Sequence, residues 1–140
     1  MSHRDTLRAT LRQDEDEVPY AYQDSEGYWS IGVGRLIDKR RGGRLRPDEI
    51  ALMLENDIAD AEKDAKDLFP SFDSLSDARK VVLCSMAFNL GRNGLAAFKR
   101  LREAVADGDW VRAAGEMENS RWYGQVKGRG VRLARMMREG

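Results

Sequence analysis

Apolar residues recur along this 140-residue chain with two different spacings, and the change from one to the other separates a short β region from a helical remainder. Alternation between apolar and polar positions over 20–34 predicts a β-hairpin with strands at 20–23 and 28–34. The run Asp24-Ser25-Glu26-Gly27 lies between them. Because Asp favours the first position of a turn and Gly accepts a positive φ, this run predicts the turn that closes the hairpin.

The two faces of the second predicted strand differ in character. Trp29, Ile31 and Val33 alternate onto one face, which is apolar. Ser30 lies on the other face, between positions that include Gly32 and Gly34. Glycine weakens a strand interior, so glycines on one face indicate a place where a ligand or another backbone approaches closely. We therefore expect Ser30 to project onto a surface along which a polymer can lie.

Apolar residues outside the hairpin follow helical spacing, and caps and breakers set the ends of each segment. Pro47 suits a first helical turn, Ser76 suits a helix cap, and Gly91 suits a helix end. The segment after Ser76 is apolar nearly all round, so we expect it to run through the core. The predicted helices are 6–15, 47–69, 77–91, 93–106, 109–118 and 121–138, the last with a break at Gly128.

Length and composition narrow the class of protein. A chain of 140 residues suits one compact domain, 1–140, and we expect a monomer. We find no apolar run long enough to span a membrane and no secretory leader, so we expect folding in a cytosol and no stable membrane insertion. A single cysteine, Cys84, and a single histidine, His3, exclude an internal disulfide, a Ser-His-Asp triad and a His-rich metal site. We therefore expect no metal and no cofactor.

The net charge is zero, but the charges are separated along the chain. Residues 1–70 hold 11 basic and 16 acidic residues, a balance of −5, and residues 71–140 hold 13 and 8, a balance of +5. A basic C-terminal end is usually a solvated face, but it can also attract anionic polymers of a bacterial envelope. A neutral chain argues against a nucleic-acid partner.

Three side chains near the hairpin suggest acid–base chemistry. Glu15 ends the first predicted helix, Asp24 opens the turn, and Ser30 lies in the second strand. A glycosidase needs one carboxyl group that donates a proton and a second carboxylate that stays ionised. Each residue also has an ordinary explanation, because a Glu at a helix end is usually a solvated charge and an Asp in a turn usually accepts backbone hydrogen bonds. The combination of all three is less expected by accident.

At these residues the chain resembles the phage-type lysozymes, glycoside hydrolase family 24. The resemblance covers nearly the whole chain in order, which makes it specific. The matching segments are Asp14-Glu15, Tyr22, Asp24-Ser25-Glu26-Gly27-Tyr28, Ser30-Ile31-Gly32-Val33-Gly34, Ala87-Phe88-Asn89-Leu90-Gly91, Trp110 with Ala113-Ala114, Ser120-Arg121-Trp122-Tyr123, and 129–132.

The resemblance implies an α+β, mainly α, lysozyme-like fold. In that fold a small β-hairpin lobe, here about 16–48, is joined by a long inter-lobe helix to a helical lobe, here about 1–15 and 66–140. Glu15 would donate a proton to the leaving sugar oxygen. Asp24 with Ser30 would position the attacking water, with inversion at the sugar carbon.

The resemblance also implies substrate contacts and marks departures from the family. Substrate-binding positions would be Gly34, Leu36, Phe88, Asn89 and Arg129. Three departures lie near the hairpin: where the family usually has Gly, Thr and His, this chain has Asp16, Ser30 and Arg35. Two more lie further along the chain, where Leu101 replaces a residue with a hydroxyl group and Glu116 replaces a residue with an amide group. Serine keeps the hydroxyl but lacks the methyl that restricts a β-branched rotamer.

The function implied is a peptidoglycan hydrolase, a muramidase of the endolysin type. It would cleave the β-1,4 bond between N-acetylmuramic acid and N-acetylglucosamine, after passage from the host cytoplasm to the wall through a holin or other membrane lesion. Two alternatives stay open: a lytic transglycosylase on the same bond, which needs no water held by Asp24 and Ser30, and a non-catalytic glycan-binding module, which would be expected to lose a carboxylate.

Overall fold

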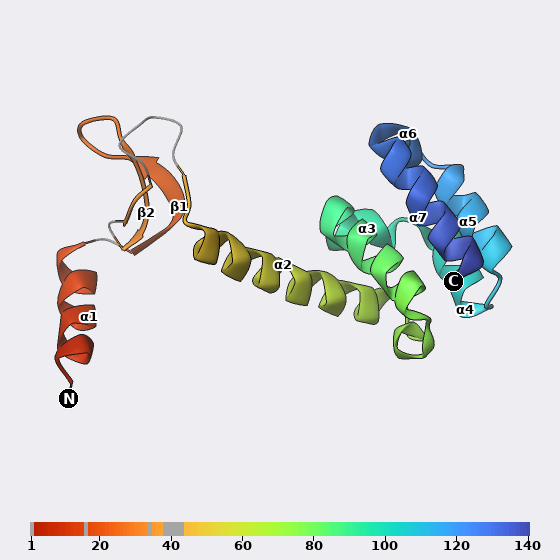
Figure 1. Ribbon diagram of the computed structural model, residues 1–140, viewed down its shortest axis with the longest axis horizontal. Coiled ribbons are helices and arrows are strands. Elements are labelled where there is room, and N and C mark those ends of the chain that lie inside the picture. Colours follow the sequence, from red (N-terminus) through yellow and green to blue (C-terminus); the bar gives the residue numbers. More distant parts are fainter. Residues whose placement is uncertain (1, 16, 34, 38–43) are drawn as a thin grey trace. The chain divides into compact units, whose positions relative to one another are not determined.

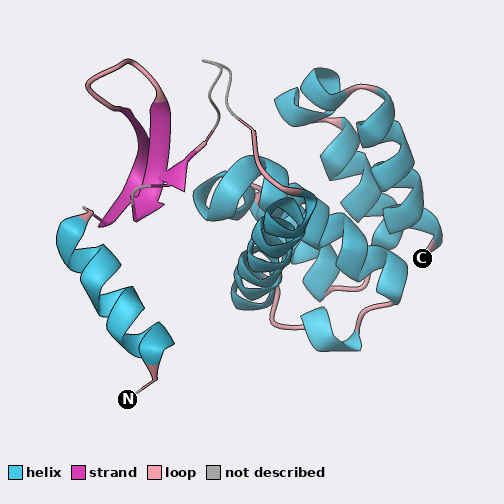
Figure 2. Cartoon of the chain, turned by 60° about the vertical axis from the view of Figure 1, so that its left-hand side comes forward, coloured by secondary structure: helices cyan, strands magenta, loops and turns pink. Residues whose placement is uncertain are grey.

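The computed structural model describes residues 2–15, 17–33, 35–37 and 44–140. Contacts within the chain divide it into two compact units, Met1–Ala51 and Leu52–Gly140. All strands lie in the first unit (Figure 2), and the second is helical. The structure is 70% helical with a small three-stranded antiparallel sheet, so the α+β, mainly α, fold class is confirmed. The lobe boundaries proposed above remain predictions.

The first unit begins with helix α1 (His3–Asp14). Ser2 caps it, since its hydroxyl accepts the Asp5 backbone N–H, and the Asp5 carboxylate in return accepts the N–H of Ser2. This reciprocal capping box satisfies two amides that a helix start leaves without partners. The helix therefore begins three residues before the predicted start and ends one residue before Glu15, its C-cap residue.

The predicted hairpin is present as β1 (Glu17–Gln23) and β2 (Trp29–Val33), joined by the predicted turn. Gly27 has a φ of 86° and donates its N–H to the Asp24 carbonyl at 3.0 Å, as the turn requires. The register is irregular between Val18 and Tyr22 of β1. Pro19 lies in that stretch and has no N–H to donate, which suits a bulge in an edge strand.

A third strand, β3 (Arg35–Leu36), was not predicted, and it changes the position of Ser30. The sheet order is β1-β2-β3, so β2 is central. Ser30 pairs with Tyr22 on one side and Leu36 on the other, and only 6% of its surface is exposed. The expectation that Ser30 projects onto an open surface was therefore wrong, since the residue is almost fully buried.

Gly32, the last residue but one of β2, is required by the backbone conformation at this position. Gly32 has a φ of 69°, in a region that L-residues rarely adopt, and nothing lies within 4 Å of the position a Cβ would take. Within the described residues, no other backbone crowds this glycine. Its backbone angle, and not a close neighbour, requires the glycine here.

The second unit contains most of helix α2 and all of the later helices. Helices α3 to α7 pack together in one bundle (Figure 1). The predicted start of α2 at Pro47 and the Ser76 cap on α3 are confirmed. The helix predicted over 109–118 begins one residue later, at Trp110, with Asp109 as its cap. The break in the last segment falls at Lys127, whose φ is 52°, one residue before the predicted position. The elements are α2 (Pro47–Leu68), a 3-10 turn η1 (Phe72–Ser74), α3 (Asp77–Ala96), α4 (Lys99–Ala106), α5 (Trp110–Glu118), α6 (Arg121–Val126) and α7 (Gly128–Glu139).

Gly91 interrupts α3, as predicted, with φ 73° and ψ 169°. The helix resumes after it and ends at Ala96, and α4 begins only at Lys99. The prediction of one helix over 93–106 was therefore wrong. Phe98 lies at the break with a non-helical ψ of 61°, and its ring packs edge-on against Trp122 at 6.5 Å between centroids. Packing of this aromatic side chain overrides local helix propensity.

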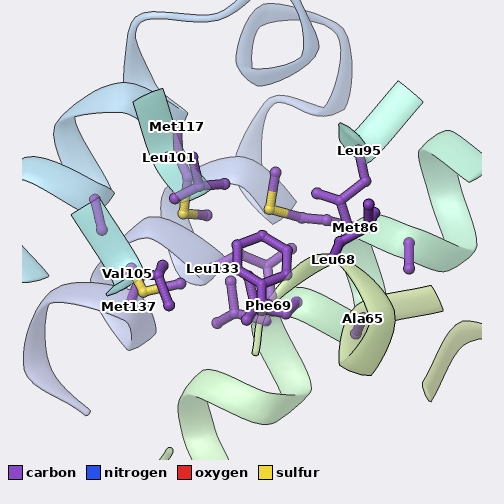
Figure 3. Close-up of a cluster of buried hydrophobic side chains, with 14 of the residues drawn as sticks. Ala65, Leu68, Phe69, Met86, Leu95, Leu101, Val105, Met117, Leu133 and Met137 are labelled. Carbon is purple, nitrogen blue, oxygen red and sulfur yellow. The ribbon is translucent and has the colours of Figure 1, made fainter. Parts of the chain in front are cut away.

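Every buried apolar residue of the described chain lies between Ala61 and Met137, so the core belongs to the second unit. Phe69, which follows α2, is in the middle of the cluster, with Leu68, Met86 and Leu133 around it (Figure 3). The prediction that the segment after Ser76 runs through the core holds for one face of α3 only. Phe88, on its other side, is 58% exposed.

Among the described residues, no single helix has both the length and the hydropathy to cross a membrane. Only α3 and α4 taken together reach that length and composition, across a bend of 105°.

Candidate active site

Asp24, the first candidate carboxylate, is held by the turn that it opens. Its Oδ1 accepts the backbone N–H groups of Glu26 and Tyr28, each at 2.9 Å. Its own N–H donates to the Tyr28 carbonyl at 2.8 Å. In the described part of the chain, its second oxygen, Oδ2, has no hydrogen-bond partner. The turn thus fixes the carboxylate through one oxygen and leaves the other available to bind water or substrate.

Ser30, the candidate hydroxyl, is the second residue of β2, the strand that follows this turn. Tyr22, its partner in β1, comes two residues before Asp24 in the chain. The Ser30 Oγ forms no hydrogen bond with a described residue. Because no fully buried side-chain oxygen or nitrogen of the described residues lacks a partner, part of the small exposed surface of Ser30 lies on this oxygen. A hydroxyl held in a central strand but open at its oxygen can position a water molecule.

Glu15, the candidate proton donor, lies at the C-cap of α1, where the backbone is already extended, with φ −112° and ψ 140°. Its N–H donates to the Leu11 carbonyl at 2.8 Å, which fixes the backbone at the helix end. Its side chain is exposed and makes no hydrogen bond or ion pair with a described residue. Two residues singled out in the sequence lie outside the described residues: Asp16, which replaces the usual glycine of the family, and Gly34, a predicted substrate contact.

Arg35 stands where the resembled family usually has His, and it is engaged in an ion pair. Its guanidinium binds the Glu49 carboxylate with both terminal nitrogens, Nη2 to Oε1 at 2.8 Å and Nη1 to Oε2. Glu49 Oε1 also accepts the Arg46 N–H at 3.0 Å. The hydrogen bond from Arg35, and then that from Arg46, lowers the pKa of Glu49. The pair joins β3 to the start of α2, and Leu36 beside it is 40% exposed.

Three predicted substrate contacts, Phe88, Asn89 and Arg129, come together in the second unit. They line one cavity of about 270 Å³. Phe88 and Asn89 come from α3 and Arg129 comes from α7, so helices distant in sequence supply the wall. An exposed aromatic ring beside an amide and a guanidinium is a surface suited to a sugar with polar substituents. The structure thus favours a surface position over core packing for Phe88.

Asn89 has a partner in this cavity that the sequence did not reveal. Its Oδ1 accepts the indole N–H of Trp122 at 2.8 Å. Trp122 is 4% exposed and Asn89 is exposed, so the hydrogen bond connects the core to the cavity wall. The Asn89 NH₂ group and the second lone pair of Oδ1 are left to contact a ligand. Of the three tryptophans, Trp122 is buried, whereas Trp29 and Trp110 are half-buried.

A second, larger cavity of about 530 Å³ lies in the same unit. Glu116, a departure from the family, is part of its wall, together with Leu90, Phe98, Arg100 and Arg121. Leu101, the other departure, is only 1% exposed and belongs to the core. It therefore serves packing, and a polymer at the surface cannot reach it.

Residues from α2 and α3 complete the first cavity, and the sequence analysis did not single them out for this role. Leu54, Ile58, Cys84 and Ser85 line it. Leu54 and Ile58 are apolar residues at helical spacing in the sequence. Such spacing predicts that a residue faces the interior side of a helix, but it does not distinguish the wall of a cavity from the core. Burial raises the pKa of the Cys84 thiol, with a smaller contribution from Glu62, which suits a packing role for this cysteine.

A mainly helical chain with a small three-stranded antiparallel sheet is consistent with an α+β lysozyme-like fold. The profile of the family described as "Phage lysozyme" matches residues 12–138. This chain therefore belongs to the phage lysozyme family and is a lysozyme-type hydrolase.

Curated relatives agree with this assignment. The pre-baseplate central spike protein Gp5 of Enterobacteria phage T4 is 30% identical over 96% of this chain, which spans 28% of that protein. "Probable T4-type lysozyme 1" of Dictyostelium discoideum is 27% identical, with 96% of this chain and 95% of that protein covered. "Peptidoglycan hydrolase gp36" of Pseudomonas phage phiKMV is 26% identical over 93% of this chain, which spans 15% of that protein.

Proposed function

We propose that this protein is a muramidase that hydrolyses the β-1,4 bond between N-acetylmuramic acid and N-acetylglucosamine in peptidoglycan. The observation that carries the proposal is the family match over 12–138, because Glu15, Asp24 and Ser30 all lie inside it. A relative named as a peptidoglycan hydrolase supports the choice of substrate.

In the proposed mechanism Glu15 is the general acid. Its carboxyl group gives a proton to the glycosidic oxygen as the bond to the sugar carbon breaks, so the leaving sugar departs as an alcohol. Glu15 lies at the C-cap of α1 with an exposed side chain, so its carboxyl group is accessible to a substrate, which supports this role.

Asp24 and Ser30 hold the attacking water on the opposite side of the sugar. Asp24 Oδ2 takes a proton from this water while the Ser30 hydroxyl orients it, and the oxygen then bonds to the sugar carbon with inversion. Two observations support this assignment: Oδ1 of Asp24 is already occupied by turn amides, and the Ser30 hydroxyl has no described partner but reaches solvent. An inverting pair requires a carboxyl separation of about 6.5–9.5 Å.

Substrate contacts are assigned to Leu36 in the first unit and to the cavity of Phe88, Asn89 and Arg129 in the second. Phe88 supplies an apolar face for a sugar ring, and Arg129 supplies a cation for a carboxylate of the muramyl substituent. Asn89 contributes its NH₂ group. In this proposal the enzyme is a monomeric endolysin that folds in the host cytoplasm and reaches the wall through a holin or another membrane lesion.

A turbidity assay on purified peptidoglycan tests the assignments with Glu15→Gln, Asp24→Asn and Ser30→Ala. We expect Glu15→Gln and Asp24→Asn to lose at least about a hundredfold in rate, the usual contribution of a general acid or base. Glu17→Gln is the matched control, because it removes a neighbouring exposed carboxylate. If Glu15→Gln clears peptidoglycan as fast as the wild type, the acid assignment is wrong.

The released fragments separate the proposal from its alternatives. Hydrolysis leaves reducing ends, whereas a lytic transglycosylase leaves anhydro-muramyl ends, and mass spectrometry distinguishes the two. A non-catalytic binding module would retain peptidoglycan in a pull-down and release no fragments. Proton NMR of the first product would show the opposite anomer if the enzyme inverts, and the same anomer would exclude the water-positioning role of Asp24.

A further inference from the structure

The exposed side of the last helix has a row of arginines that the proposed function uses only in part. Residues 121–140 contain six basic residues and one acidic residue, a balance of +5 in a chain of net charge zero. Arg138 pairs with Glu118. Within the described residues, the side chains of the other five form no ion pair and no hydrogen bond; these residues are Arg121, Lys127, Arg129, Arg132 and Arg135. This end of the molecule therefore has cationic groups available for an external anion.

The packing of α7 determines which side its arginines occupy. Its buried positions are Gly130, Leu133, Ala134 and Met137, which face α3, α5 and α6. Arg129, Arg132 and Arg135 are exposed. They follow one another at intervals of three residues, so neighbouring side chains lie on adjacent turns and the row extends for about 9 Å along the helix. We call these three residues the arginine row.

We propose that the arginine row binds an anionic, phosphate-bearing lipid surface, so that this protein attaches peripherally to anionic membrane. The guanidinium group suits this partner, because its planar array of donors binds phosphate oxygens in pairs. Val131, 45% exposed next to the row, adds an apolar group at the depth of lipid headgroups. The apolar side of α7 is already buried in the core, so the attachment is electrostatic and involves no insertion of the helix.

The features of this surface favour lipid over nucleic acid. A protein that binds single strands stacks bases on exposed aromatic rings, and double strands require a strongly basic domain. In the described segment after Ser120, Trp122 is buried and Tyr123 is half-buried, so neither forms an exposed platform. The neutral chain as a whole would also be a weak ligand for a polyphosphate backbone, whereas a lipid surface needs only the one cationic face.

Vesicle sedimentation of the full chain tests the proposal, with vesicles of phosphatidylglycerol in phosphatidylcholine and vesicles of phosphatidylcholine alone. The variants carry Glu15→Gln, so that the result does not depend on hydrolysis and stands apart from the proposed function. Arg132→Gln/Arg135→Gln removes two cations from the row and leaves Arg129 in its cavity. Lys63→Gln/Lys66→Gln is the control, since it lowers the net charge equally on α2.

We expect binding to the anionic vesicles only, reversed by high salt, and weakened about thirtyfold in the arginine double variant, from about 1 kcal/mol per cation. The lysine double variant should bind like the parent, and Arg132→Lys/Arg135→Lys should restore most of the affinity. Equal weakening by both Gln double variants would overturn the proposal, because net charge would then explain the binding. Failure to bind anionic vesicles, or tighter binding to duplex DNA through the same arginines, would overturn it as well.

Discussion

The kink of α3 at Gly91 allows a test in which two glycines, changed to the same residue, give opposite results. Gly91 has φ 73° and ψ 169°, a combination that is essentially restricted to glycine. Nothing lies within 4 Å of the position that a Cβ would take there. In Gly91→Ala the cost therefore comes from the backbone conformation alone, and no steric clash adds to it.

The expected loss for Gly91→Ala is about 1–3 kcal/mol in the free energy of unfolding, the usual cost of a residue held in such a region. Gly115 is the matched control. It lies inside α5 with a negative φ, and a Cβ there also meets nothing within 4 Å. Because alanine restricts the unfolded chain and favours helix, Gly115→Ala should gain about 0.5–1 kcal/mol.

Urea unfolding followed by circular dichroism measures both changes, and a constant m-value shows that the denatured state is unaltered. Thermal midpoints should move in opposite directions, by about 2–4 °C for each kcal/mol in a chain of this size. If Gly91→Ala is as stable as the wild type, then the kink does not depend on a glycine-only conformation and the reasoning fails. A loss in both variants would mean that any added methyl group is harmful, and would also refute it.

The remaining predictions concern two polar contacts. Arg35 and the Arg46 N–H lower the pKa of Glu49 below its ordinary 4.5. The hydrogen bonds to the Glu49 carboxylate therefore stabilise the folded protein at pH values above 4.5, and this stabilisation is lost as the pH falls through the pKa of Glu49 in the folded state. We expect Glu49→Gln to lower the thermal midpoint at neutral pH and to flatten its decline on acidification, and an unchanged decline would contradict this. For Trp122 and Asn89, a double-mutant cycle with Trp122→Phe and Asn89→Ala should give a coupling of about 0.5–1.5 kcal/mol, from one hydrogen bond. Additive effects would show that the bond contributes nothing.

The sequence predicted those features of the fold that depend on local chemistry. The turn at Asp24, the helix start at Pro47, the cap at Ser76 and the kink at Gly91 each follow from the conformation of one residue type, and all are confirmed. Long-range packing escaped prediction. Phe98 ends a helix because its ring packs on Trp122, and no local pattern marks that contact.

The candidate site shows the same division. The family resemblance selected Phe88, Asn89 and Arg129 one by one, and the structure groups them around one cavity. The indole that binds Asn89 was not predicted, because a hydrogen bond between residues 33 positions apart leaves no trace in periodicity. For the same reason the pairing of Arg35 with Glu49 was missed, although both residues are visible as charges in the sequence.

The burial of Ser30 changes the meaning of the missing threonine. In a strand with an open face, a β-branched side chain would hold the hydroxyl better than serine, because its rotamers are restricted. Ser30 instead lies in the central strand between Tyr22 and Leu36, with 6% of its surface exposed. Packing against these neighbours can restrict the rotamer as a methyl group would, so the proposed water-positioning role does not require threonine. In this proposal the sheet would supply the order that the side chain lacks, since β3 brings Leu36 beside Ser30.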